Sequence, residues 1–134
     1  GEILAIEATP DETFSQKILG DGYLIKPTNG VVVAPFDGEV MHFFPTKHAI
    51  ALKNSDDVEV LIHIGIDTVK MNGRGFKGFV EIGDRVKQGQ KLIEFDLHLV
   101  KAEAKSDLTP VVFTNTDKKV VISKKSNQHV EVSF

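Results

Sequence analysis

The segment from residue 58 to residue 66 constrains the fold of this chain more than any other. Valine or isoleucine occupies every second position, as Val58, Val60, Ile62, Ile64 and Ile66. Successive side chains of a β-strand point to opposite faces, so this spacing predicts a strand with one wholly aliphatic face. The opposite face is more polar and carries Glu59, Leu61, His63, Gly65 and Asp67. We therefore expect a half-buried strand that presents a histidine away from the core.

The rest of the chain favours the same class of structure. Short runs rich in valine, isoleucine and phenylalanine alternate with Gly, Pro, Asn and Asp, for example at 30–35, 38–41 and 90–95, which is typical of strands and turns. One or two very short helices are expected, and the candidates are Asp11–Leu19 with Gly20 as a stop and Asp96–Lys105, each with its aspartate as the N-cap. At 134 residues and 41% hydrophobic, residues 1–134 are predicted to form a single all-β domain.

Composition excludes several functions. The chain has 16 Lys and Arg against 19 Asp and Glu, and this balance argues against nucleic-acid binding, which usually needs a basic cluster. There is no cysteine, so disulfides and thiol chemistry are excluded. No apolar run approaches the roughly 20 residues that span a bilayer, so we expect no membrane insertion by this chain. Five histidines remain as the side chains that titrate near neutral pH.

Two of these histidines are expected to meet across a hairpin. Residues 47–53 are predicted to form a second strand, joined to the first by four turn-forming residues at 54–57. Symmetric pairing about a four-residue loop predicts the pairs Lys53–Val58, Ala51–Val60, Ile50–Leu61 and His48–His63. Opposed side chains in such pairs have Cβ atoms about 5 Å apart. His48 and His63 are therefore expected to share one small ligand.

Two kinds of ligand suit such a pair. A neutral imidazole is a good nucleophile toward a phosphoryl group, and a second imidazole can donate a hydrogen bond to the phosphoryl oxygens. Gly65 leaves room for a bulky anion, and the Thr46 hydroxyl is placed to hold an imidazole tautomer. The alternative is zinc, for which the two histidines supply two ligands and Asp67 is the nearest further candidate in the sequence.

The chain resembles a known family through several motifs. Leu61-Ile62-His63-Ile64-Gly65-Ile66-Asp67-Thr68-Val69 is similar to the active-site signature of the enzyme IIA components of the glucose class (glucose, sucrose and β-glucoside) of the bacterial phosphoenolpyruvate-dependent sugar phosphotransferase system. Further similarity lies at 18–22, 33–38, 44–49 and 108–112, in the same order along the chain. The resemblance implies an antiparallel β-sandwich with Greek-key and jelly-roll character.

The resemblance also implies a role for individual residues. His63 is expected to accept the phosphoryl group, His48 to stabilise it and Thr46 to add hydrogen-bond support. The family docks its partners through an apolar ring with acidic edges, and the residues aligned with that surface are Phe14, Ile18, Leu19, Phe44, Leu61, Asp11 and Asp67. An exposed apolar patch with charged edges suits a weak, fast-exchanging interface.

Partners and location follow from the same resemblance. The phosphoryl donor is expected to be the histidine-containing phosphocarrier protein HPr, and the acceptor a IIB domain of a sugar permease, which phosphorylates the sugar during uptake. No cofactor is required, although some members of the family bind Zn through the two histidines and a partner carboxylate. The protein is expected to be cytoplasmic, either free or tethered to the membrane as a domain of a larger permease.

Two alternative functions remain open from the sequence. Residues 83–92 are also similar to a turn-and-strand element of biotinyl and lipoyl domains, and Lys70 beside Met71 is the candidate for modification. A carrier domain modified on Lys70 is therefore one alternative. The other is a IIA-like regulatory domain, which controls transport through its phosphorylation state without passing the group on.

Overall fold

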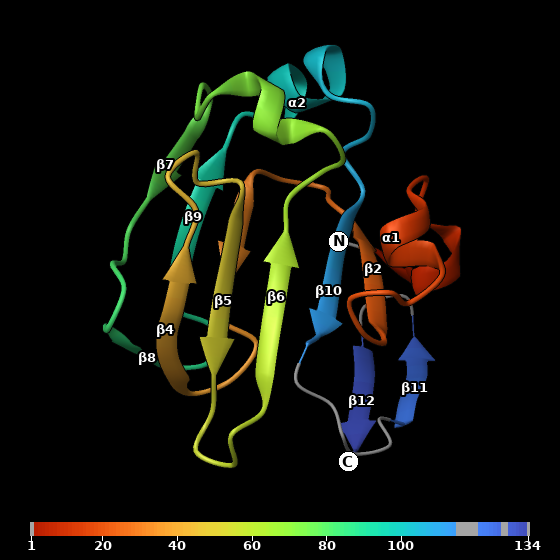
Figure 1. Cartoon of the computed structure of the whole chain (residues 1–134), viewed down its shortest axis with the longest axis vertical. Coiled ribbons are helices and arrows are strands. Elements are labelled where there is room, and N and C mark those ends of the chain that lie inside the picture. The colour runs from red at the N-terminus through yellow and green to blue at the C-terminus, as the bar shows by residue number, and fades with distance from the viewer. Residues whose placement is uncertain (1, 115–120, 127–128, 134) are drawn as a thin grey trace.

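The chain folds into antiparallel β-structure with few helices, as predicted (Figure 1). A computed structural model describes residues 2–114, 121–126 and 129–133. The strands are β1 (Glu2–Ala5), β2 (Gly22–Lys26), β3 (Val31–Val33), β4 (Gly38–Phe43), β5 (Ala49–Lys53), β6 (Glu59–His63), β7 (Phe76–Gly78), β8 (Arg85–Val86), β9 (Lys91–Phe95), β10 (Thr109–Phe113), β11 (Val121–Ser126) and β12 (His129–Ser133). The helical segments are the 3₁₀ turns η1 (Ile6–Ala8) and η2 (Thr68–Met71) and the helices α1 (Glu12–Ser15) and α2 (Leu97–Glu103).

Two sheets enclose the core. The larger sheet has the order β1-β2-β10-β6-β5-β4-β8, the smaller sheet has the order β3-β9-β7, and β11 pairs with β12. Aliphatic side chains of both sheets form one buried cluster, which includes Leu52 and Val60 of the large sheet and Leu92 and Ile93 of the small one. This is the predicted sandwich. β10 lies between β2 and β6, so distant parts of the chain pair side by side, as Greek-key arrangements require (Figure 1).

The alternation in the central strand is confirmed, but the strand is shorter than expected. Val60 and Ile62 are buried, whereas Glu59, Leu61 and His63 are partly exposed. β6 ends at His63, because the chain turns at Gly65 (φ +71°) and Asp67 (φ +62°) into η2. Both angles lie in the left-handed region, which a strand does not use. The expectation that Gly65 and Asp67 continue the histidine face of the strand is therefore wrong.

Both predicted helices exist, and their N-caps are confirmed. The Asp11 carboxylate accepts a hydrogen bond from the Thr13 amide at 2.9 Å, and the Asp96 carboxylate accepts one from the Leu99 amide at 3.0 Å. α1 is shorter than predicted and does not extend to a stop at Gly20, because Lys17 adopts a left-handed conformation (φ +59°) soon after Ser15. Among the described residues, no helix is long and apolar enough to cross a membrane.

The β5–β6 hairpin forms in a register that differs by one residue from the prediction. Ala49 pairs with His63, and Lys53 pairs with Glu59. His48 lies just before β5, where its carbonyl oxygen accepts a hydrogen bond from the amide of Ile64 at 2.7 Å. The prediction that His48 and His63 are directly paired across the two strands is therefore wrong.

The turn explains this shift. The Asn54 amide donates to the Val58 carbonyl at 3.0 Å, and the Asp57 amide donates to the Asn54 carbonyl at 3.2 Å. Asp57 has φ +62°. This is a three-residue loop in which a type I turn is followed by a left-handed residue, one of the common hairpin connections. The loop makes Asn54 and Val58 the closing pair, which moves every later pair by one residue.

Candidate functional site

The two histidines lie in a cleft with a volume of about 330 Å³. The cleft is formed by the start of α1, the loop before β5, the end of β6 and the start of η2. Its lining residues are Asp11, Thr13, Phe14, Phe44, His48, His63, Ile66, Asp67, Thr68 and Val69. Segments that are distant in the sequence therefore contribute to one site.

The rings of His48 and His63 meet despite the changed register. Their centroids are 5.0 Å apart and their planes are inclined by 80°. His48 is almost entirely buried, at 3% exposure, whereas His63 is partly exposed. The predicted proximity is confirmed, and it arises because His48 lies outside the regular strand, beyond the left-handed Lys47 (φ +59°).

Hydrogen bonds fix the orientation of each imidazole. His63 Nδ1 lies 2.7 Å from the carbonyl oxygen of Gly65. A carbonyl can only accept, so Nδ1 carries the proton and Nε2 keeps its lone pair. His48 Nδ1 lies 2.5 Å from the Thr46 hydroxyl. When this hydroxyl donates to Nδ1, the ring proton of His48 lies on Nε2.

Burial favours the neutral form of both rings. The pKa of His48 is lowered to about 4, mainly by burial and in smaller part by the neighbouring His63. Burial also lowers the pKa of His63, although the bond to Gly65 and the carboxylates of Asp11 and Asp67 act in the opposite direction. A neutral pair offers one unprotonated nitrogen as a nucleophile beside one N–H donor.

Aromatic rings flank the pair on both sides. The ring of Phe14 lies 5.2 Å from that of His63, and the ring of Phe44 lies 5.4 Å from that of His48. Two carboxylates, those of Asp11 and Asp67, line the same cleft. The site therefore combines a neutral histidine pair with apolar walls and an acidic edge.

Three residues expected in the docking surface lie outside this lining. Ile18 and Leu19 follow α1 and are 68% and 40% exposed. Leu61 packs against a small cluster under α1 that includes Phe14. Phe14 is itself buried, so it acts as a wall of the cleft, while Ile18 and Leu19 offer exposed apolar surface.

The sequence analysis missed other parts of the site. The carbonyl of Gly65 orients His63, although the glycine was considered only for the space it leaves. A Cβ at this position would lie 2.6 Å from a methyl of Thr68 and 2.8 Å from the Ser106 carbonyl. Thr68 in turn donates to the Ile64 carbonyl at 2.6 Å. A glycine before Ile-Asp-Thr is the signal that could have suggested a left-handed turn.

A metal ion would find only part of its ligands here. Among the residues that the structure describes, no three His, Cys, Asp or Glu side chains gather closely enough to hold one. His48 and His63 offer two nitrogen ligands, and zinc prefers four ligands in total. The remaining ligands would have to come from another molecule.

Comparison with known proteins identifies the family. The sequence model of the family described as phosphoenolpyruvate-dependent sugar phosphotransferase system, EIIA 1, matches residues 1–119. The chain belongs to this family. A glucose-specific EIIA component of Bacillus cereus is 52% identical over 117 residues, covering 87% of this chain and 71% of the relative. A glucose-specific EIIA component of Halalkalibacterium halodurans is 50% identical over 126 residues, covering 94% of this chain and 73% of that relative.

Further relatives agree with this assignment. A glucosamine-specific EIICBA component of Bacillus subtilis is 52% identical over 116 residues, which cover 87% of this chain and 18% of that protein. The solved structure of glucose permease IIA from Mycoplasma capricolum superimposes with a TM-score of 0.90 at 35% identity, covering 98% of this chain and 88% of that one. The resemblance and the fold class are therefore confirmed.

Family membership also bears on the functions predicted from the sequence. The chain is a phosphocarrier component of a phosphotransferase system for sugar uptake. These matches favour that prediction over a biotinyl or lipoyl carrier. Lys70 lies in η2 with its amine 3.5 Å from the Asp67 carboxylate, beside the histidine cleft.

Proposed function

We propose that His63 carries the phosphoryl group on Nε2. The observation that supports this most directly is the 2.7 Å contact between His63 Nδ1 and the Gly65 carbonyl, since it leaves Nε2 as the nitrogen with a free lone pair. Nε2 forms a bond to phosphorus as the bond to the donor's ring nitrogen breaks. The donor ring carries a proton on its other nitrogen and so leaves as a neutral imidazole, while His63 keeps its Nδ1 proton on the Gly65 carbonyl. The group then passes to the acceptor by the same kind of displacement.

We propose that His48 stabilises the transferring group. Its Nε2–H, set by the Thr46 hydroxyl at Nδ1, donates a hydrogen bond to a phosphoryl oxygen as negative charge shifts during transfer. The ring separation of 5.0 Å suits two imidazoles that serve one phosphoryl group. Thr46 supports this arrangement without touching the phosphoryl group itself.

HPr is the proposed donor, and the IIB domain of a sugar permease is the proposed acceptor. The carboxylates of Asp11 and Asp67 at the cleft and the net charge of −3 favour basic partner surfaces. Exposed apolar contacts come from Ile18 and Leu19 beside α1. The domain acts on the cytoplasmic side of the membrane in this proposal, either free or as part of a longer permease such as the EIICBA relative.

Phosphoryl labelling tests the acceptor. The protein is incubated with labelled phosphoenolpyruvate, enzyme I and HPr, and the acid-labile label on the chain is measured. His63→Ala should abolish the label, whereas His98→Ala, which removes an exposed histidine of α2, should leave it unchanged. Full labelling of His63→Ala, or ³¹P spectra that place the phosphorus on Nδ1, would refute the assignment.

Onward transfer tests His48 and separates a carrier from a regulatory domain. The phosphorylated protein is mixed with a IIB domain, and loss of label from the chain is followed. His48→Gln should still accept phosphate on His63 but should transfer it more slowly. Label that stays on the wild-type chain in the presence of a cognate IIB domain would favour the regulatory alternative.

Zinc at His48 and His63 is a separate proposal. It requires a carboxylate from a partner, because the described residues supply only the two histidine nitrogens at this place. Isothermal titration with zinc should give tighter binding when the partner is present than with the chain alone. Equal affinity in both titrations would contradict a shared site.

A further inference from the structure

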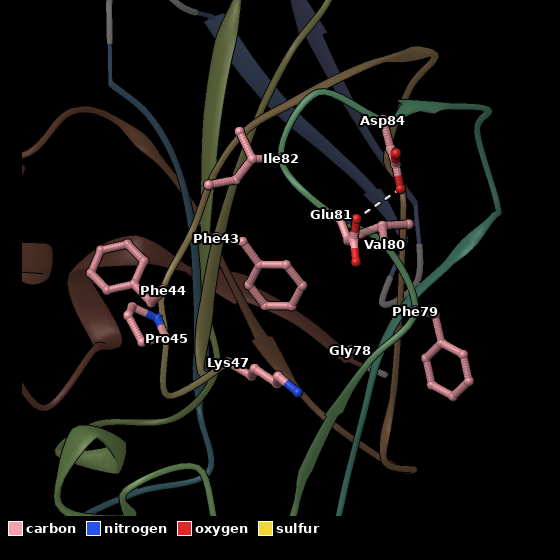
Figure 2. A pocket seen from close by; sticks show the side chains of 10 residues that line it. All are labelled: Phe43, Phe44, Pro45, Lys47, Gly78, Phe79, Val80, Glu81, Ile82 and Asp84. Carbon is pink, nitrogen blue, oxygen red and sulfur yellow. Dashed lines mark hydrogen bonds between the residues drawn. The ribbon is translucent and has the colours of Figure 1, made fainter.

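Phe44 separates two hollows of the surface. On one side it lines the histidine cleft. On the other side it borders a larger groove, with a volume of about 600 Å³, between residues 43–47 and residues 78–84. Figure 2 shows Phe43 projecting into the middle of this groove, with Phe44 and Pro45 at its margin. A side chain with open space on two sides is held by few contacts and needs specific neighbours to fix its rotamer.

His42 provides such a contact. Its ring lies 4.9 Å from the ring of Phe44, with the planes inclined by 78°. Edge-to-face ring pairs of this geometry are stabilising in addition to the effect of the apolar area that they bury. Phe44 meets His48 at 5.4 Å and 65°, and His48 meets His63 at 5.0 Å. The four rings therefore form a continuous row that begins outside the cleft and ends at the proposed phosphoryl acceptor.

A β-bulge places His42 in this row. Val40 pairs with Leu52, but His42 pairs with Ala51, so Met41 is an extra residue in β4. In a regular strand, His42 would share the face of Val40, which is fully buried. The bulge turns His42 to the outer face, where it is exposed and reaches Phe44. The bulge therefore brings the ring of His42 against Phe44, which lines the histidine cleft.

We propose that His42 is a positioning residue of the phosphoryl-transfer site, acting through Phe44 to hold the ring of His48 against His63. This inference rests on the proposed function of the two cleft histidines. His42 is not among the residues that line the cleft, so its effect must pass through the ring of Phe44. Loss of the edge contact lets Phe44 turn toward the groove, and His48 then loses the ring that packs against it.

Three substitutions distinguish an aromatic contact at residue 42 from the effect of a charge there. His42→Ala removes the ring, His42→Phe supplies an aromatic ring without a titratable group, and His42→Lys supplies a cationic group without a ring. Met41→Ala is the matched control, because Met41 is an exposed neighbour on the same strand that lines a different hollow with Lys53 and Arg85. Each protein is first labelled through HPr, which shows that it folds and accepts phosphate.

Single-turnover transfer to a IIB domain is then measured over a range of acceptor concentrations. One aromatic edge contact is worth a factor of roughly two to ten in an equilibrium constant. His42→Ala should therefore lower the limiting transfer rate by about two- to tenfold while the half-saturating acceptor concentration stays unchanged. His42→Phe should restore the rate, and His42→Lys should not. The imidazole proton resonances of His48 should shift in His42→Ala and return in His42→Phe.

The outcomes distinguish this inference from the proposed function. If the wild-type chain is not labelled on His63, the proposed function fails. If it is labelled and transfers normally, but His42→Ala transfers at the wild-type rate, only the role of His42 is refuted. A change confined to the half-saturating concentration, or rescue by His42→Lys and not by His42→Phe, would make His42 a docking residue and would overturn the positioning role.

Discussion

Replacing Thr46 by valine tests how much the tautomer of His48 contributes to transfer. Valine has nearly the same shape as threonine but cannot donate to His48 Nδ1, which lies 2.5 Å from the hydroxyl. His48 is only 3% exposed, so water has little access to replace the lost donor. A buried acceptor without a partner costs about 1–3 kcal/mol. We take about 1–2 kcal/mol, because the ring can recover part of this cost by rotating or changing its tautomer.

This cost should appear as a slower phosphoryl transfer. About 1–2 kcal/mol corresponds to a rate that is roughly five- to thirtyfold lower. The assay is single-turnover transfer from the labelled chain to a saturating IIB domain. Thr46→Ser is the matched control, because it keeps the hydroxyl and should transfer within about threefold of the wild type. A wild-type transfer rate in Thr46→Val, or an equal loss of rate in Thr46→Val and Thr46→Ser, would refute the role given to this hydrogen bond.

Three further predictions concern stability. The free energy of unfolding should fall as the pH is lowered from 6.5 toward about 4, because the unfolded chain binds a proton that buried His48 does not. The contribution of His48 to this fall is at most about 3 kcal/mol. Denaturant titrations of His48→Gln over the same pH range should lack that contribution. Gly65→Ala should lower stability by at least about 2 kcal/mol. Thermal unfolding should show a larger loss for Gly65→Ala than for Gly89→Ala, because a Cβ at residue 65 lies 2.6 Å from Thr68 whereas one at residue 89 meets nothing within 4 Å, although both positions have positive φ. Equal losses of stability in the two variants would contradict this. Asp96→Ala should cost about 1 kcal/mol through loss of the α2 N-cap, and unchanged thermal stability would show that the cap is dispensable.

Local patterns predicted the elements of this fold well. The two-residue period at 58–66 identified the buried face of β6 because burial on one side enforces the alternation. Asp11 and Asp96 marked helix starts because a carboxylate there accepts from free amides. The end of α1 was missed, since the left-handed conformation of Lys17 is not favoured by its side chain.

The hairpin register shows where such patterns stop being sufficient. Residues 54–57 are all turn formers, and they suit a four-residue loop as well as the three-residue loop that forms. The choice depends on whether Asp57 becomes left-handed, which costs little for aspartate. His48 and His63 still meet, because the chain leaves regular strand geometry before β5.

The walls of the cleft were harder to predict than its centre. His48, His63 and Thr46 lie within one hairpin and the loop before it, so sequence spacing relates them. Phe14 comes from α1, and Val69 lies in η2. Their positions depend on packing between distant segments, and the family resemblance supplied Phe14 where local reasoning could not.

The hydrogen bond from His63 Nδ1 to the Gly65 carbonyl has a consequence for mutational tolerance. Its acceptor belongs to the main chain, so no exchange of a neighbouring side chain removes it directly. Only a change in the path of the backbone can do so, and substitution of Gly65 itself is the shortest route, because φ there is +71°. Random mutagenesis should therefore find few sites at which nucleophile orientation is lost while the fold survives. Insertions between residues 63 and 65 should be the most damaging changes near the cleft.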